Sequence, residues 1–165
     1  MSDATGSPDV TFRSFRAEDA PAVKDLNVAA LRSIYPLYKN GPWNVDLDAI
    51  EDRYLDGGDF LVGLEGSQIV AIGALRRVSA EVAEIKRVGV DPERQGRGIG
   101  TALLLALERR ASDLGFSRII LDTTEKQLVA QGMYERHGYV EIDRKPVAYS
   151  PRVTMETSFY EKILC

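Results

Sequence analysis

The chain has 165 residues, of which 44% are hydrophobic and 28% charged, and its formal net charge is −4. This length suffices for one domain with a substantial core and is too short for two of ordinary size. The composition is typical of a globular protein and excludes an intrinsically disordered chain. The acidic balance gives no sign of a nucleic-acid partner, and no apolar run approaches the ~20 residues of a membrane span.

Residues 1–9 lack the basic start and the apolar stretch of a signal peptide. We therefore expect a flexible tail over 1–9, a single domain over 10–165 and a cytoplasmic location. The only cysteine, Cys165, and the only histidine, His137, exclude an internal disulfide, a thiolate cluster and a multi-histidine metal site. No metal is expected, and His137 is expected to stabilise the C-terminus of a helix.

The first third of the chain predicts a strand followed by two helices. Residues 10–15 alternate in polarity, as a strand does. Residues 17–35 carry a helical apolar face that opens with acidic residues and Pro21. A loop follows over 37–44, and a short helix is expected over 46–55, capped by Asp46.

The remaining two thirds predict strands over 60–64, 69–75 and 82–90, the first two joined by a two-residue hairpin with Gly66 first. A helix over 98–114 follows, with Gly115 as its C-cap and Glu108 among its water-facing residues. A strand over 118–122, a helix over 127–136 and strands over 139–142 and 153–160 complete the chain.

The order of elements is therefore β-α-α-β-β-β-α-β-α-β-β. The strand, helix and strand over 84–122 form a right-handed βαβ unit, whose two strands should run parallel. We predict a single α/β domain, with α+β character, in which helices cover both faces of a mixed central sheet of about six to seven strands. The long last strand could support a homodimer.

A glycine-rich loop, Arg94-Gln95-Gly96-Arg97-Gly98-Ile99-Gly100-Thr101, lies where a strand ends and the long helix begins. Three glycines in five positions let the backbone approach a ligand closely and point successive N–H groups towards it. The helix N-terminus contributes partial positive charge and Arg97 a full one. Together these features predict a binding site for a diphosphate group.

Two familiar nucleotide-binding loops do not fit this segment. The P-loop requires a lysine that is missing here. The dinucleotide fingerprint requires glycine where Thr101 stands, and it belongs in a first βα turn. A plain strand-to-helix turn is the structural alternative. The spacing that does fit is Gln/Arg-x-x-Gly-x-Gly/Ala, met by Gln95, Gly98 and Gly100.

Over residues 10–162 the chain resembles the GNAT superfamily of N-acetyltransferases, most specifically from Arg94 to Leu104. A second match runs from Gln127 to Tyr139 and is similar to the family's Asn-x-x-Ala-x-x-x-Tyr-x-x-x-Gly-Phe. The resemblance implies transfer of the acetyl group of acetyl-CoA, as cosubstrate, directly to a primary amine of a small molecule or peptide.

The resemblance also implies where acetyl-CoA binds. The pantetheine arm would pair with the backbone around Val88 and Val90, and Gly89 would ease the bulge that separates two strands. Gln127 replaces the usual asparagine and offers the same amide on a longer arm. The main-chain N–H groups expected to hold the phosphates belong to Gln95, Gly96, Arg97, Gly98, Ile99, Gly100 and Thr101.

Two residues are implied to act in the reaction. Tyr134 would be the general acid, because a phenol with an ordinary pKa near ~10 is protonated at neutral pH and can donate to the leaving thiolate. Its alternative is a packed aromatic. Glu84, eleven residues before Gln95, would be the base, directly or through a water. Its alternatives are a solvent-facing strand glutamate and one that only orients the amine. Many relatives use only a water chain, so loss of Glu84 need not abolish activity.

Acceptor specificity in the family comes from the early helices, their connecting loop and the last strands. The corresponding candidates here are Tyr35, Trp43 and Tyr149, each of which could equally be core packing. Arg87, with neighbouring basic residues, could receive an acidic acceptor. Two functions remain open: an N-acetyltransferase, and a regulatory domain that binds CoA or another ligand without turnover. The presence of both Tyr134 and Glu84 favours the enzyme.

Overall fold

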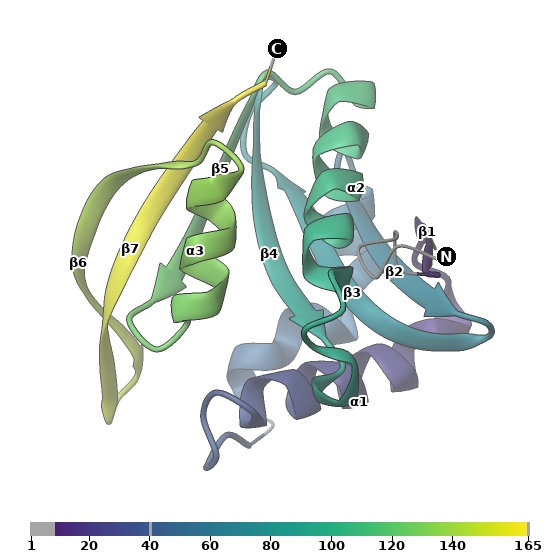
Figure 1. The fold of residues 1–165 in the computed structure, drawn as a ribbon, viewed down its shortest axis with the longest axis horizontal. Coiled ribbons are helices and arrows are strands. Elements are labelled where there is room, and N and C mark those ends of the chain that lie inside the picture. Colours follow the sequence, from purple (N-terminus) through teal and green to yellow (C-terminus); the bar gives the residue numbers. More distant parts are fainter. Residues whose placement is uncertain (1–8, 40, 165) are drawn as a thin grey trace, which may run out of the picture.

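The computed structural model describes residues 9–39 and 41–164 (Figure 1). Most of the expected tail over 1–9, and Cys165, lie outside the described residues. The main elements are β1 (Thr11–Ser14), α1 (Ala20–Arg32), β2 (Asp59–Glu65), β3 (Gln68–Arg77), β4 (Val82–Val90), α2 (Ile99–Asp113), β5 (Arg118–Thr124), α3 (Leu128–Arg136), β6 (Val140–Ser150) and β7 (Val153–Ile163).

The strands form one seven-stranded sheet in the order β1-β2-β3-β4-β5-β7-β6. Neighbouring strands are antiparallel except β4 and β5, which pair in parallel, as predicted for two strands joined through a helix. The fold is therefore the single α/β domain with a mixed sheet that the sequence predicts.

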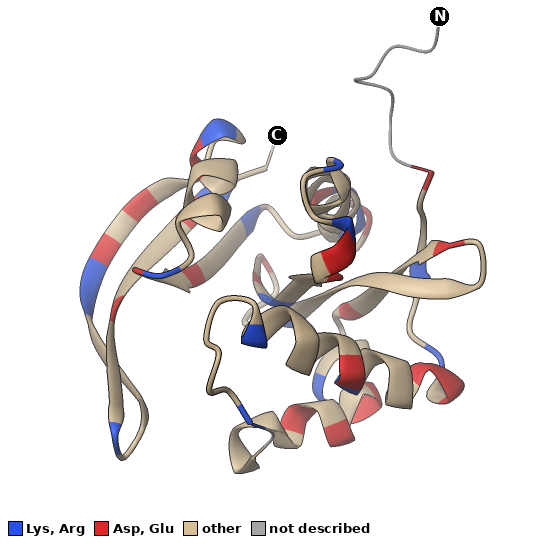
Figure 2. Ribbon diagram, turned by 60° about the horizontal axis from the view of Figure 1, so that its bottom comes forward, with Lys and Arg blue, Asp and Glu red and all other residues tan. Residues whose placement is uncertain are grey.

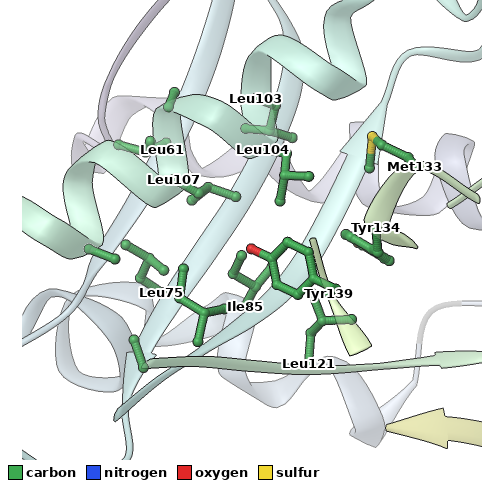
Figure 3. Packing of buried hydrophobic residues seen from close by; sticks show 14 of the residues in the cluster. Leu61, Leu75, Ile85, Leu103, Leu104, Leu107, Leu121, Met133, Tyr134 and Tyr139 are labelled. Atoms are coloured by element: carbon green, nitrogen blue, oxygen red, sulfur yellow. The ribbon is translucent and has the colours of Figure 1, made fainter. Parts of the chain in front are cut away.

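Apolar side chains form a core on each face of the sheet. On one face α2 and α3 pack over β3, β4 and β5, and Figure 3 shows Leu103 and Leu107 of α2 in the same cluster as Tyr134 of α3. On the opposite face α1 and residues 47–54 cover β2 and β3, with Val23 and Leu26 fully or almost fully buried. Helices on both faces are thus confirmed. These faces are called below the α2 face and the α1 face.

Two glycines in the left-handed region set the ends of α2. Gly98 precedes the helix with a φ of 81°, and Gly115 follows it with a φ of 91°. The N–H of Gly115 donates to the carbonyl of Ser112 and the N–H of Phe116 to that of Ala111, each over 3.0 Å. This is the Schellman arrangement that ends a helix at glycine. The helix therefore begins immediately after the predicted phosphate loop.

The single helix predicted over 46–55 is wrong. The structure has a 3-10 helix over Pro42–Asp48 and then one π-helical turn over Glu51–Leu55. Asp46 does not cap a helix, because its carboxylate accepts hydrogen bonds from the side chains of Arg87 and Tyr54. Side-chain contacts from distant elements thus decide the local backbone here.

The expectation that Glu108 faces water is also wrong. Its side chain is only 11% exposed and accepts a hydrogen bond from Lys162 Nζ over 2.7 Å. The hydroxyl of Tyr139 donates to the same carboxylate over 3.3 Å. Hydrogen bonds from Tyr139 and Lys162, which follow Glu108 by 31 and 54 positions, thus hold this helix glutamate in a buried position.

The last two strands are longer than predicted, and they form a hairpin that reaches from Val140 to Ile163. Most side chains of β6 are exposed, so burial does not alternate along the strand. The sequence is therefore under no requirement to alternate apolar and polar residues there. Pro146 is tolerated because β6 is an edge strand.

Candidate active site

The glycine-rich loop presents unpaired main-chain donors. The first helical hydrogen bond of α2 runs from the N–H of Ala102 to the carbonyl of Gly98, so the N–H groups of residues 99–101 have no acceptor within the helix. Gly96 and Gly98 have φ values of 80° and 81°, and a Cβ added to either would meet no heavy atom within 4 Å. The loop is open on its outer side, which fits a diphosphate group.

The two arginines of the loop differ in their partners. Arg94 is held by the carboxylates of Glu65 and Asp91, over 3.2 and 2.8 Å. Arg97 is exposed and makes no side-chain hydrogen bond or ion pair with another described residue. Gln95 connects the loop to β4, because its Nε2 donates to the carbonyl of Val90 over 3.4 Å. Arg97 is therefore the loop cation free to meet a phosphate.

Strands β4 and β5 diverge after a short stretch of pairing. Their parallel pairing covers three residue pairs and ends at Glu84 and Ile120, whereas β4 continues to Val90 and β5 to Thr124. Figure 1 shows the two strands starting together and separating towards the N-terminus of α2. The main chain of β4 around Val88 thus has no partner strand on its β5 side, and this is the segment that the family resemblance implies for the pantetheine arm.

A β-bulge in β4 accompanies this divergence. Ile72 of β3 pairs with Gly89 and Ala74 pairs with Lys86, so two residues of β4 lie opposite Gly73. One of the two is Arg87, whose φ of 58° makes it the only non-glycine residue in the left-handed region among those described. An L-residue pays about 1–2 kcal/mol for that conformation.

The role expected for Gly89 is therefore wrong. Gly89 pairs regularly with Ile72, while Arg87 occupies the left-handed position of the bulge. The lack of a side chain at Gly89 serves packing instead, since an added Cβ would lie 3.2 Å from the Cβ of Ala30 in α1. This glycine lets α1 approach the sheet closely.

Arg87 fixes the segment between α1 and β2. Its guanidinium donates to both carboxylate oxygens of Asp46 over 2.9 and 2.6 Å, to Asn44 Oδ1 over 3.0 Å and to the carbonyl of Trp43 over 2.9 Å. Burial alone would raise the pKa of Asp46, but hydrogen bonds from Arg87 and Tyr54 and the positive charge of Arg87 outweigh it and lower the pKa. With its charge neutralised in this way, Arg87 is a poor candidate for binding an acidic acceptor.

Trp43 belongs to the segment that Arg87 fixes. The residue is 46% exposed, and its ring stands edge-on to Tyr38, with ring centroids 6.5 Å apart. The hydroxyl of Tyr38 in turn accepts a hydrogen bond from the Asn44 side chain. The indole is therefore held at the surface by its neighbours, as a wall residue would be.

Tyr134 combines a buried ring with an unpaired hydroxyl. The side chain is 5% exposed and packs edge-on against Tyr139, with ring centroids 5.6 Å apart. Its hydroxyl forms no hydrogen bond with another described residue. The hydroxyl oxygen is nevertheless not fully enclosed by the described residues. Burial raises its pKa above that of a free phenol, and the nearby carboxylate of Asp122 adds to the rise. The phenol therefore stays protonated and keeps some contact with solvent.

Glu84 is the last residue of β4 that pairs with β5, and its side chain points to the α1 face, opposite Ala83 and Ile85 of the α2-face core. Its Oε1 accepts hydrogen bonds from Arg76, with Nε at 3.0 Å and a terminal guanidinium nitrogen at 2.9 Å. The side chain is 17% exposed. The predicted base is therefore already held by a guanidinium.

Gln127 is engaged with the end of β5. Its side-chain oxygen accepts from the hydroxyl of Thr123 and from the N–H of Thr124, each over 3.0 Å. Only its amide N–H groups are left for a ligand. His137 behaves as expected, because its Nδ1 bonds to the carbonyl of Met133, 2.8 Å away in the last turn of α3.

Tyr35 and Tyr149 are brought together by a pair of threonines. Thr124 of β5 and Thr157 of β7 are direct cross-strand partners. The hydroxyl of Tyr35 bonds to that of Thr124, and the hydroxyl of Tyr149 bonds to that of Thr157 over 2.9 Å. Residues 114 positions apart thus meet on the α1 face beside the diverging strands.

Sequence reasoning missed Asp122, two residues before Thr124 on the same face of β5. It is exposed and interacts electrostatically with Lys86 and Glu84. The available signal was a carboxylate that interrupts the apolar strand residues and is followed by two buried threonines. Asp46 was missed as the partner of Arg87, because 41 positions separate the two residues.

Figure 2 shows the β6–β7 hairpin and the α1 region on opposite sides of the end of β5, with acidic residues spread along the helical segments.

Among the described residues no group of three or more His, Cys, Asp or Glu is placed to hold a metal ion. In the same part of the chain, no helix is both long and apolar enough to cross a membrane.

Comparison with known families identifies the class of protein to which this fold and loop belong. Residues 28–139 match the model of the acetyltransferase (GNAT) family. The chain is also 30% identical, over 141 residues, to an amino-acid acetyltransferase of Mycobacterium tuberculosis; the match covers 82% of this chain and 71% of that protein. The chain therefore belongs to the GNAT acetyltransferase family.

A mycothiol acetyltransferase of Salinispora tropica is 32% identical over 139 residues. That match covers 79% of this chain and only 44% of the relative. The chain thus spans less than half of that enzyme's length.

Solved structures agree on the fold. A GNAT-family acetyltransferase of Staphylococcus aureus superimposes with a TM-score of 0.81 at 22% identity, over 94% of this chain and 99% of that one. The acetyltransferase YncA of Salmonella typhimurium, solved with its cofactor acetyl-CoA, gives a TM-score of 0.76 at 19% identity and covers 94% of each chain. At these identities the likeness establishes the fold alone.

Proposed function

We propose that the chain transfers the acetyl group of acetyl-CoA directly to a primary amine, and that a small-molecule amine is the acceptor. The observation that carries the proposal is the placement of three features at one point of the sheet. These are the unpaired N–H groups at the start of α2, the unpaired edge of β4, and the free hydroxyl of Tyr134. Two relatives are named an amino-acid acetyltransferase and a mycothiol acetyltransferase, and these names favour a small acceptor.

Acetyl-CoA, as cosubstrate, would supply an activated acetyl thioester. The open glycine loop and residues 99–101 would bind its diphosphate, with Arg97 as a cationic partner. The backbone of Val88 and Val90, which has no partner strand on the β5 side, would bind the pantetheine arm, and the amide N–H groups of Gln127 would be further donors. The free donors at the α2 N-terminus support this fit.

Tyr134 would protonate the leaving sulfur. Burial raises the pKa of its phenol, so the proton is present at neutral pH, and the hydroxyl has no competing partner among the described residues. A carboxylate on the α1 face would take the proton that the amine loses, and the family motif points to Glu84 for this role. Tyr35, Trp43 and Tyr149 would contact the acceptor on that face.

The test begins with acetyl-CoA binding. Acetyl-CoA should raise the melting temperature, because a ligand that binds only the folded state stabilises it. Release of the CoA thiol is then followed with the twenty L-amino acids and a set of small primary amines. Tyr134→Phe should lower kcat by a factor of about 10² or more and leave acetyl-CoA binding intact.

Tyr139→Phe is the matched control, because it removes a phenol from the same cluster. The Tyr139 hydroxyl bonds to Glu108, away from the diverging strands, so its loss should reduce stability and spare kcat. Tight acetyl-CoA binding without turnover of any amine would favour the regulatory domain instead. Full activity of Tyr134→Phe would remove the phenol from the mechanism.

A further inference from the structure

Asp122 lies on β5 just beyond the last residue that pairs with β4. The parallel pairing ends at Glu84 and Ile120. Because side chains alternate along a strand, Asp122 shares the α1 face with Thr124, whereas Leu121 packs in the core of the α2 face. Asp122 is therefore located where β4 and β5 diverge, on the face opposite α3.

Asp122 and Glu84 differ in what already binds them. Glu84 accepts two guanidinium contacts from Arg76 at 3.0 and 2.9 Å. Asp122 is exposed, and among the described residues its carboxylate has no hydrogen-bond or ion-pair partner. Both Arg76 contacts fall on Oε1 of Glu84, so that carboxylate keeps one free oxygen beside a paired guanidinium. Asp122 has both oxygens free and no paired cation among the described residues.

The surroundings of Asp122 also suit a proton acceptor. The titratable and charged groups that face it are Lys86 and Glu84 of β4, Tyr134 of α3 and Tyr149 of β6. Although the Asp122 side chain is exposed, partial desolvation by the surrounding protein raises its pKa, Lys86 opposes the rise and Glu84 adds to it. A carboxylate with a raised pKa is a stronger base.

We propose that Asp122, and not Glu84, receives the proton that the acceptor must lose, so that the acceptor binds as a cationic ammonium. This inference rests on the proposed acetyltransferase function. The ammonium group lies against the Asp122 carboxylate on the α1 face, and the Tyr134 hydroxyl lies across the diverging strands. Glu84 stays hydrogen-bonded to Arg76 and orients its neighbours.

The proton balance of the step is simple. Asp122 takes one proton from the ammonium and later releases it to solvent. The neutral amine forms a C–N bond with the acetyl carbon, and the C–S bond breaks. Tyr134 gives its proton to the departing sulfur and regains one from the N–H that the new amide must lose. Each turnover therefore yields an acetylated amine, a CoA thiol and one released proton.

The experiment compares Asp122→Asn with Glu84→Gln, two isosteric changes that each remove one charge. The substrate is acetyl-CoA with the best amine from the panel of L-amino acids and small primary amines. Asp122→Asn should lower kcat/KM at pH 7 by about 10² or more, within the range for loss of a general base. Glu84→Gln should lower it less than tenfold, and Asp122→Glu should recover part of the loss.

The pH profile separates a chemical role from a structural one. In Asp122→Asn, kcat/KM should rise about tenfold per pH unit up to the pKa of the acceptor amine, because only the free amine then reacts. The wild-type profile should level off at lower pH. Acetyl-CoA affinity and melting temperature should be unchanged, as expected for an exposed and unpaired side chain. Asp113→Asn, on the exposed side of α2, is the neutral control.

Each outcome decides between the proposals. Suppose that the wild-type protein turns over an amine. If Asp122→Asn is then as active as wild type, or if Glu84→Gln loses more activity than Asp122→Asn, the role of Asp122 is overturned and the acetyltransferase function stands. A wild-type protein that binds acetyl-CoA and acetylates no amine overturns both.

Discussion

Replacing Arg87 by alanine and by glycine tests the bulge and the ion pair separately. Arg87 and Asp46 are each 16% exposed, so truncating the guanidinium leaves a mostly buried carboxylate without its cationic partner. Breaking a fully buried pair costs about 3–5 kcal/mol. With the remaining exposure, we expect about 3 kcal/mol for Arg87→Ala.

The glycine variant should be less destabilised than the alanine variant. Both lose the guanidinium, but only glycine escapes the cost of about 1–2 kcal/mol for an L-residue at a φ of 58°. Glycine costs about 0.5–1 kcal/mol more than alanine in an ordinary strand, through the entropy of the unfolded chain. The difference leaves Arg87→Gly more stable than Arg87→Ala by about 0–1.5 kcal/mol, with a mid-range value of about 0.8 kcal/mol.

Urea unfolding of the two variants measures this difference, and thermal unfolding checks it at about 2–4 °C per kcal/mol for a chain of this size. Lys86→Ala and Lys86→Gly form the matched control pair, because Lys86 is the exposed neighbour and has no positive φ. There the order should reverse, with glycine the less stable. If Arg87→Gly is less stable than Arg87→Ala, the strained conformation of Arg87 is refuted. If neither variant loses stability, the ion pair contributes nothing.

Two further predictions concern the loop and the acid range. Gly98→Ala meets no steric obstacle but strains a position at φ 81°, so we expect the KM for acetyl-CoA to rise several-fold in initial-rate measurements, with little change in kcat at saturation; an unchanged KM would exclude the loop from binding. Because the folded pKa of Asp46 is lowered, its contribution to stability is complete above the unfolded pKa of about 3.9 and is lost as pH falls below that value. Asp46→Asn should therefore flatten the loss of stability on acidification below about pH 4 in urea titrations, and an unchanged slope would argue against the shift.

Much of the fold was predictable because local signals and long-range packing agree. The strand over 82–90 and the glycines around α2 are placed as the sequence predicts, since a buried strand and a left-handed glycine each leave a local mark. The segment over 42–55 was not predictable in detail. Its backbone depends on the bond between Asp46 and Arg87, whose partners are 41 positions apart.

The predicted donor side of the site rests on local signals of the same kind. Phosphate binding relies on consecutive backbone N–H groups, so it is encoded in a short run of glycines before a helix. Tyr134 follows from a motif within one helix. Both are local features, and the structure places them at the same divergence of β4 and β5.

The acceptor side is built from single residues of separate elements, and for that reason it has no motif. Tyr35 and Tyr149 meet only because Thr124 and Thr157 are cross-strand partners. Glu84 and Asp122 look equivalent in the sequence, since each is a carboxylate within an apolar strand. What separates them is Arg76, which pairs with Glu84 across β3 and β4 and leaves Asp122 free. The choice between the two candidate bases thus depends on the register between β3 and β4. A sequence motif around Glu84 alone carries no information about that register.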